Sequence, residues 1–286
     1  MERGAGRFRH QSSETNLTPP DPSYAGRVTV LELHVERRGS GPSLVLSHGF
    51  GGSARNFRPQ FRAFSDRHEV VVYDTRGHAR SPAPLDPAEY TEAELVGDLS
   101  RLVAGATAPV VLGGLSLGAY TALKAALADP GSICGLVLAS YPSTEPGTAR
   151  AEWALGFADA IDRDGLDRAG EQFVWGPKSR FDSEARALIR RGLLEHPAHA
   201  LSAILRHVLT QVSAPEALAP QLRSLEVPVL VIVGGDDTPA LEPCRRLAEL
   251  LPNAELSVVP GAGHVVNLGA PGAFNELLGK FLERLG

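Results

Sequence analysis

Residues 110–123 read Val-Val-Leu-Gly-Gly-Leu-Ser-Leu-Gly-Ala-Tyr-Thr-Ala-Leu, and this stretch decides the fold. An apolar run typical of a buried strand passes through Gly114-Leu115-Ser116-Leu117-Gly118 into a pattern typical of a helix. A serine between such a strand and helix occupies a tight turn, and the flanking glycines let the backbone pass closely on either side. The helix start also supplies positive potential beside the serine. The stretch therefore predicts a nucleophilic Ser116 rather than a structural serine in a glycine turn.

Similar short apolar runs occur on both sides of this turn. They have the length and β-branched content of buried strands and lie at residues 43–47, 69–73, 109–112, 133–139, 227–233 and 256–259. An alternating segment at 28–36 predicts a half-buried strand before them. Helical patterns separate most runs, at 53–64, 91–104, 117–127, 241–251 and 273–285, and Thr91 with Glu94 has the spacing of a capping box. Strands that alternate with helices predict a mostly parallel sheet covered on both faces.

The alternation stops between about residues 143 and 223. This stretch carries five helix-like patterns, near 148–163, 166–174, 183–195, 198–211 and 216–225, and no convincing strand. We interpret 143–222 as a helical insertion over the carboxyl edge of the sheet. The core then consists of 25–142 and 223–286, and residues 1–24, rich in Pro and Ser, are expected to be a flexible segment.

Composition excludes several classes of function. The chain of 286 residues is 43% hydrophobic and 21% charged, and its net charge of −5 is spread without a basic stripe, so no nucleic-acid partner is expected. No stretch approaches the roughly 18 apolar residues of a membrane span, and the polar start does not resemble a secretory signal, which favours the cytoplasm. Cys134 and Cys244 are expected to be free thiols. A monomer or small homo-oligomer is expected.

A serine nucleophile needs a base, and the base needs a carboxylate to orient it. Downstream of Ser116, the run at 227–233 leads to Asp236 and Asp237, and the run at 256–259 leads through a glycine-rich loop to His264. Functional groups of open parallel sheets collect at the carboxyl ends of the strands. These residues are therefore the candidate partners of Ser116.

Five motifs follow one another in a recognisable order. They are His48-Gly49-Phe50-Gly51-Gly52, Asp74-Thr-Arg76-Gly77-His78-Ala79-Arg80-Ser81, the Ser116 turn, Gly234-Gly-Asp236-Asp237 and Gly263-His264. In them the chain resembles the α/β-hydrolase superfamily, in the serine-nucleophile branch that holds oxoadipate enol-lactonases and small-molecule carboxylesterases. The resemblance runs from about residue 28 to residue 285. It implies an α/β-hydrolase fold, with a mostly parallel sheet of about eight strands, flanking helices and a helical cap. Ala79 departs from the glycine usual at its position.

The resemblance also implies roles for residues. Ser116 is the expected nucleophile, His264 the base and Asp237 the acid, because the Gly-x-x-Asp spacing from Gly234 selects Asp237 over Asp236. Glu145 is a third choice for the acid. The backbone N–H groups of Phe50 and Leu117 are the expected oxyanion hole, and His78 is expected to hold the Asp74 loop in shape. No metal or organic cofactor is implied, and a metal site at His196, His199 and His207 is disfavoured because no further ligand completes it.

The expected reaction is cleavage of an ester or lactone bond of a small to medium substrate through an acyl-enzyme. Three alternatives use the same triad, namely a carbon–carbon bond hydrolase, a lyase and a cofactor-free perhydrolase. A ligand receptor that keeps the fold is the alternative outside enzymes. The sequence identifies no contact for a substrate carboxylate; Arg150, Arg180, Arg190 and Arg191 are the candidates.

Overall fold

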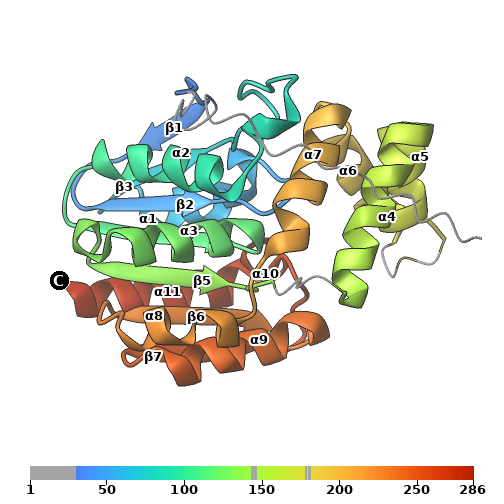
Figure 1. Cartoon of the computed structure of the whole chain (residues 1–286). Helices are drawn as coiled ribbons and strands as arrows, with labels where there is room; N and C mark the ends of the chain where they lie inside the picture. The colour runs from blue at the N-terminus through green and yellow to red at the C-terminus, as the bar shows by residue number, and fades with distance from the viewer. Residues whose placement is uncertain (1–29, 143–146, 178, 180–181) are drawn as a thin grey trace, which may run out of the picture.

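The apolar runs form one seven-stranded sheet in the computed structural model, which describes residues 30–142, 147–177, 179 and 182–286 (Figure 1). Its strands are β1 (Val35–Arg38), β2 (Ser43–Ser47), β3 (Glu69–Tyr73), β4 (Val110–Leu115), β5 (Gly135–Ala139), β6 (Val229–Gly234) and β7 (Ala254–Val259). Their order across the sheet is β1-β3-β2-β4-β5-β6-β7. Only β1 pairs antiparallel, with β3, so the prediction of a mostly parallel sheet is confirmed, and seven strands fit the expected number of about eight.

The first strand is shorter than its pattern predicts. The alternating segment covers 28–36, but β1 begins at Val35, and residues 28 and 29 lie outside the described part of the chain. Val35 pairs with Tyr73, the last residue of β3, and Arg38 pairs with Val70. Just before Val35, the His34 carbonyl still accepts from the Asp74 N–H, but the His34 N–H donates to the Ser81 hydroxyl instead of to a strand.

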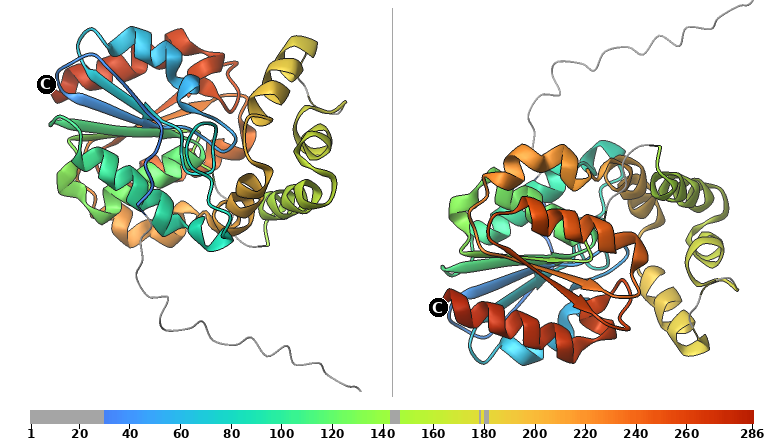
Figure 2. Two further views of the ribbon diagram at one scale, coloured as in Figure 1. Left: turned by 90° about the horizontal axis from the view of Figure 1, so that it is seen from above. Right: turned by 90° about the horizontal axis from the view of Figure 1, so that it is seen from below.

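Helices cover both faces of the sheet, as Figure 2 shows in two views. One face holds α1 (Arg58–Phe64) and α11 (Pro271–Leu285), and the other holds α2 (Glu92–Ala104), α3 (Leu117–Ala128) and α9 (Thr238–Leu250). Side chains alternate along each strand, so Leu44 and Leu46 join the core under α1 and α11 while Val45 joins the core under α2 and α3. The short helices α8 (Ala219–Arg223) and α10 (Val266–Gly269) complete this part of the chain.

The described residues between β5 and β6 contain no strand and form a series of helices joined by turns. They form α4 (Ala149–Asp164), α5 (Leu166–Gly170) followed by a π-helical turn (Glu171–Trp175), α6 (Ser183–Leu193) and α7 (Ala198–His207) before α8. Figure 1 shows α4, α5, α6 and α7 beyond the ends toward which the arrows of β2 and β5 point. These helices therefore lie on the carboxyl side of the sheet.

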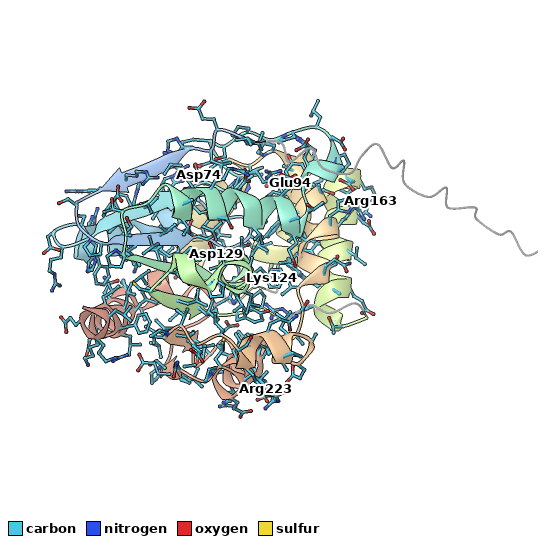
Figure 3. The ribbon with its side chains drawn as sticks, turned by 60° about the vertical axis from the view of Figure 1, so that its left-hand side comes forward. Asp74, Glu94, Lys124, Asp129, Arg163 and Arg223 are labelled. Carbon is cyan, nitrogen blue, oxygen red and sulfur yellow. The ribbon has the colours of Figure 1, made fainter. Side chains whose placement is uncertain are left out.

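The start of α2 departs from its sequence pattern. The Thr91 side chain accepts a hydrogen bond from the Glu94 backbone, as a capping residue should. The Glu94 side chain, however, pairs with Arg76 at 2.7 Å instead of turning back to the helix start. Figure 3 labels Glu94 on α2. The Glu94 carboxylate therefore binds the buried guanidinium of Arg76 and does not complete the capping box.

The cysteines and the lengths of the helices complete the description of the fold. Cys134 and Cys244 are both free thiols. In the described ranges, no helix combines the length and the apolar character needed to cross a bilayer.

Candidate active site

Ser116 stands between the last residue of β4 and the first residue of α3, with a backbone φ of 55° and ψ of −117°. A residue with a side chain rarely adopts this conformation, which costs roughly 1–3 kcal/mol and persists only where the surroundings impose it. A Cβ on Gly114 would lie 2.2 Å from the carbonyl oxygen of Gly118, and one on Gly118 would lie 2.1 Å from that of Ser47. Both glycines are therefore required by close backbone approach at this turn.

Three predicted residues lie together at the carboxyl ends of different strands. Ser116 follows β4, Asp237 follows β6 and His264 follows β7. The His264 Nε2 lies 2.9 Å from the Ser116 Oγ, and the His264 Nδ1 lies 2.8 Å from the Asp237 Oδ2. Because an ionised carboxylate can only accept, Nδ1 carries the hydrogen and Nε2 is left to accept from the serine hydroxyl. The arrangement is that of a serine with a base and an orienting acid.

The two neighbouring aspartates have different environments. Asp237 is 5% exposed and bonds to His264, and although it stands at the start of α9, its side chain makes no capping bond there. Asp236 is exposed, and its backbone N–H bonds to the Ala262 carbonyl. Asp236 thus ties down the loop before His264 through its backbone, and its side chain does not cap α9. Glu145 lies outside the described residues.

The two predicted oxyanion donors lie at neighbouring strand ends. Phe50 follows β2, and Leu117 is the first residue of α3, next to Ser116. Neither backbone N–H donates a hydrogen bond to any group in the part of the chain that the structure describes. Leu117 in the first turn has no carbonyl within the helix to bond to. Both donors are thus available to a ligand.

Two buried histidines support the loop that carries Phe50. His48 donates from Nδ1 to the Gly49 carbonyl and accepts at Nε2 from the backbone and hydroxyl of Thr75. His78 accepts at Nε2 from the backbone N–H of Gly51. The sequence predicts that His78 holds the Asp74 loop; in the structure its ring also holds the Phe50 loop. Burial lowers the pKa of His48 to about 4 and that of His78 well below its ordinary value, so both rings are neutral near pH 7.

The Asp74 motif also holds the chain that follows the Phe50 loop. The Asp74 carboxylate accepts from the Ala54 backbone at 2.7 Å and from the Arg80 Nε at 2.8 Å. Burial alone would raise the pKa of Asp74, but these hydrogen bonds lower it below its ordinary value. Arg76 is fully buried and contacts both oxygens of the buried Asp98 on α2, at 2.6 and 2.9 Å. The sequence patterns above do not identify Asp98 as a partner of Arg76. The signal for it is that Asp98 is a carboxylate on the otherwise apolar face of α2.

The four arginines considered for a substrate carboxylate differ in their surroundings. Arg150, in the first turn of α4, is half-buried, and its Nη1 is buried without a hydrogen-bond partner among the described residues. Burial lowers the pKa of Arg150, and the negative charge of Asp237 acts in the opposite direction. Arg190 pairs with Asp167 at the surface, Arg191 is exposed, and Arg180 lies outside the described residues.

The histidines of the insertion do not share a ligand site. His196 bonds to the Gly51 carbonyl and the Ala79 backbone, and His199 lies 3.2 Å from the Pro84 carbonyl. No group of three or more His, Cys, Asp or Glu suited to a metal ion occurs within the described residues.

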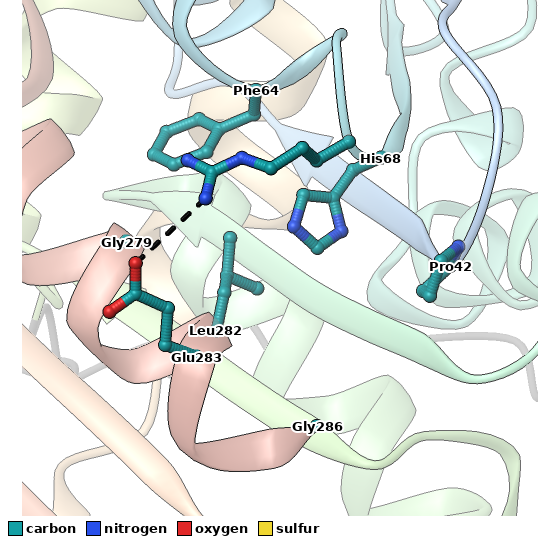
Figure 4. A pocket seen from close by; sticks show the side chains of 8 residues that line it. Pro42, Phe64, His68, Gly279, Leu282, Glu283 and Gly286 are labelled. Carbon is teal, nitrogen blue, oxygen red and sulfur yellow. Dashed lines mark ion pairs between the residues drawn. The ribbon is translucent and has the colours of Figure 1, made fainter.

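A depression of about 240 Å³ lies at the opposite end of the strands (Figure 4). Pro42, just before β2, and His68, just before β3, contribute to its wall, and an Arg67–Glu283 ion pair crosses it at 3.9 Å. Its lining includes no serine, cysteine or carboxylate–histidine pair. The carboxyl edge of the sheet is therefore the better candidate for chemistry.

The chain is similar in sequence and in structure to known hydrolases. Residues 44–277 match the family model described as the alpha/beta hydrolase family. A protein of Variovorax paradoxus named as a carbamate hydrolase, RutD, is 30% identical, with 89% of this chain and 97% of that protein covered. An esterase structure from Thermogutta terrifontis superposes with a TM-score of 0.77 at 26% identity, covering 89% of this chain and 94% of the esterase. The enol-lactonase from Burkholderia xenovorans gives 0.76 at 26% identity, covering 88% and 97%.

The neutral buried histidines predict a pH dependence of stability. Since the pKa of His48 falls from 6.5 to about 4 on folding, the unfolded chain binds the extra proton between these values. The free energy of unfolding is therefore expected to be highest above about pH 6.5 and to fall as the pH is lowered, with His48 alone contributing about 3 kcal/mol by pH 4. His78 adds a loss of the same sign, whereas Asp74 adds its loss only below about pH 4.

Urea unfolding at several pH values between 7 and 4.5 measures this effect, because the slope against pH gives the protons taken up on unfolding. We expect a slope of about one proton or more below pH 6. A free energy of unfolding that stays flat across this range would contradict the assignment of neutral buried rings.

Proposed function

The chain belongs to the alpha/beta hydrolase family, and we propose that it is a serine hydrolase that cleaves an ester or lactone bond through an acyl-enzyme. The observation that carries the proposal is the pair of hydrogen bonds that join Ser116, His264 and Asp237. The relatives are named for carbamate, ester and enol-lactone substrates, and all three classes present a carbonyl carbon to a nucleophile. Acyl transfer at a carbonyl is the chemistry common to them.

The proposed reaction has two halves. Ser116 Oγ attacks the carbonyl carbon while its proton passes to His264 Nε2, and the carbonyl oxygen becomes an oxyanion. Collapse expels the alcohol or enol oxygen, which takes the proton from His264, and leaves an ester on Ser116. A water molecule then gives its proton to His264 and attacks this ester. The second collapse releases the acid and returns the proton to Ser116. Asp237 holds His264 in the required tautomer throughout.

We propose that the N–H groups of Phe50 and Leu117 bind the oxyanion. Their lack of other acceptors within the described residues supports this role. Each such donor contributes about 3 kcal/mol to stabilising the transition state, because it points where negative charge develops and needs no reorganisation. The helix start at Leu117 adds positive potential at the same place.

We propose that residues 143–222 act as a cap over this site. One face of α4 supports the idea, because residues 150 and 157 lie two turns apart on it. At one end Arg150 interacts electrostatically with Asp237, and at the other the Phe157 ring lies 6.3 Å from the Phe50 ring. Trp153, between them, contacts the Phe157 ring at 5.5 Å. This arrangement favours small to medium substrates with an apolar portion.

Arg150 also suggests a preference within this class. A guanidinium atom that is buried without a partner is unfavourable unless a ligand completes its hydrogen bonds. We propose that it accepts an anionic group of the substrate, such as a carboxylate away from the scissile bond. The alternatives on the same triad, carbon–carbon bond hydrolysis, a lyase reaction and perhydrolysis, are not favoured by a separate observation.

Replacing the nucleophile tests the proposal directly. Ser116→Ala should reduce turnover of p-nitrophenyl acetate by about 10⁴-fold or more, because the triad residues act as a unit. The thermal unfolding midpoint should change little, since alanine meets the same backbone strain as serine at this φ. Retained activity in the variant would exclude Ser116 as the nucleophile, and absence of turnover in the wild-type protein would favour the ligand receptor.

The paired aspartates provide a matched comparison. Asp237→Asn should lower kcat by about 10³–10⁴-fold, because an amide no longer stabilises the required His264 tautomer. Asp236→Asn changes an exposed side chain in the adjacent position and should alter kcat by less than about threefold. Steady-state kinetics of both variants on one ester measures the difference. Reversed losses would move the acid to Asp236.

The cap proposal predicts a change in substrate preference. Trp153→Ala should widen the space beside Phe157 and shift kcat/KM toward longer acyl chains by roughly tenfold relative to acetate, the scale set by one or two methylene groups. Leu188→Ala, on the same insertion but 60% exposed, is the control and should leave the chain-length profile unaltered. A series of p-nitrophenyl esters from acetate to octanoate measures the profile. The same profile in both variants would indicate that the insertion does not shape the pocket.

A further inference from the structure

A short segment between α6 and α7 docks on the Phe50 loop. The Leu193 side chain occupies the space beside Gly51, where an added Cβ would lie 2.6 Å from Leu193 Cδ1. Two residues later, the Glu195 carboxylate forms a two-point ion pair with Arg55. Next to it, His196 is 6% exposed and points inward. Residues 193–196 therefore hold the insertion against the Phe50 loop and Arg55 by an apolar contact, an ion pair and a histidine.

Both ring nitrogens of His196 make hydrogen bonds to the core. The Ala79 N–H donates to Nδ1 at 2.8 Å, so Nδ1 carries no hydrogen. Nε2 therefore carries it in the neutral ring and donates to the Gly51 carbonyl at 2.9 Å. One imidazole thus joins the Phe50 loop to the loop that follows β3.

The two backbone positions that His196 holds are both in the left-handed region. Gly51 has a φ of 67°, which glycine adopts freely. Ala79 has a φ of 43°, and an alanine there is strained. Here the sequence departs from the glycine of the family motif, and the hydrogen bond to His196 holds this residue in place. On the other side of Gly51, its N–H donates to His78, whose ring lies 5.1 Å from that of His196.

We propose that His196 is a positioning residue for the oxyanion hole, which ties the insertion to Gly51 and thereby holds the Phe50 N–H in its catalytic place. Gly51 directly follows Phe50, and both its N–H, through His78, and its carbonyl, through His196, are held by hydrogen bonds, so the Phe50 backbone is anchored on its carboxyl side. The proposal rests on the proposed function, since it assumes that this N–H binds an oxyanion. It also gives the insertion a role in catalysis beyond shaping the pocket.

The two hydrogen bonds that His196 makes to Ala79 and Gly51 require its imidazole to be neutral. Burial lowers the pKa of His196, and Arg55 acts in the same direction, while the Gly51 carbonyl, Glu195 and Asp74 act against them. The other titratable rings beside it are those of His78 and, behind that, His48. A protonated His196 would present a hydrogen on Nδ1 to the Ala79 N–H, so two donors would face each other and the bond would be lost.

Substitutions can separate the hydrogen bonds from packing. His196→Phe keeps an aromatic ring beside His78 but removes both bonds, whereas His196→Gln keeps one acceptor and one donor at a similar separation. We expect His196→Phe to lower kcat by about tenfold or more while KM changes by less than about twofold, since the lost interaction acts on the transition state. His196→Gln should recover most of this loss. His199→Phe, three residues away and bonded only to the loop at Ala83 and Pro84, is the matched control.

Phenylboronic acid is a second probe, because its adduct with Ser116 contains a tetrahedral boron, one of whose oxygens would lie at the oxyanion donors. Its inhibition constant should weaken in His196→Phe in parallel with kcat and recover in His196→Gln. Equal losses in the Phe and Gln variants, a change in KM alone, or unchanged boronate affinity would each overturn the proposal.

Amide hydrogen exchange tests the tie without any catalytic assay. Fragments covering residues 49–52 and 77–81 should exchange faster in His196→Phe than in the wild-type protein, with no change in His199→Phe. Unchanged exchange would overturn the tie even if activity were lost. Faster exchange in a protein that proves unable to hydrolyse esters would instead place the failure in the proposed function.

A pH profile covers the case in which His196→Phe does not fold. Because burial holds the pKa of His196 below its ordinary value of 6.5, its protonation on the acid side should add to the loss of kcat, so the wild-type limb should be steeper than that of a single ionisation. His196→Gln cannot be protonated and should show the shallower limb. Identical limbs in the two proteins would overturn the proposal.

Discussion

Ser116 can hold its left-handed backbone because three parallel strands enclose it. Its N–H donates to the Ala139 carbonyl at the end of β5, and Gly118 in the next turn presses against the Ser47 carbonyl at the end of β2. The same turn fixes the direction of the serine oxygen and starts α3, whose first N–H belongs to Leu117. Strand register therefore determines the positions of the Ser116 hydroxyl and the Leu117 N–H together, because neither can move without the other.

Around this turn, the protein uses two kinds of buried polar contact for different purposes. Charged pairs hold the Asp74 motif: Arg76 is enclosed by carboxylates including Asp98, and removing one member of such a pair would leave an uncompensated buried charge. Neutral imidazoles hold the Phe50 loop, which carries one of the two proposed oxyanion donors. His48 and His78 each donate with one nitrogen and accept with the other, which satisfies backbone groups that a loop cannot pair by itself.

Much of this arrangement could be predicted from local patterns. The bounds of β2 and β3 and the neighbourhood of Ser116, Asp237 and His264 follow from apolar runs that each end in a polar or glycine-rich loop. What could not be predicted depends on contacts between distant segments. β1 gives way at His34, whose N–H bonds to the distant Ser81, and Glu94 leaves its expected capping role for Arg76. His196 lacks a local signal altogether, since its partners lie 117 and 145 residues away.

The insertion leaves the sheet after β5 and returns at β6, and these two strands are paired neighbours. Because the two strands are parallel, the sheet itself fixes where the chain leaves, at the carboxyl end of β5, and where it returns, at the amino end of β6. Such an excursion is modular: a different set of helices could be grafted between the same two strands without altering their register. The contacts at Gly51 and Arg55 limit that freedom, because a grafted segment would have to supply partners for the Gly51 carbonyl and the Arg55 guanidinium. A chimera that matched the strand ends but lacked these partners would leave the Phe50 loop less firmly held.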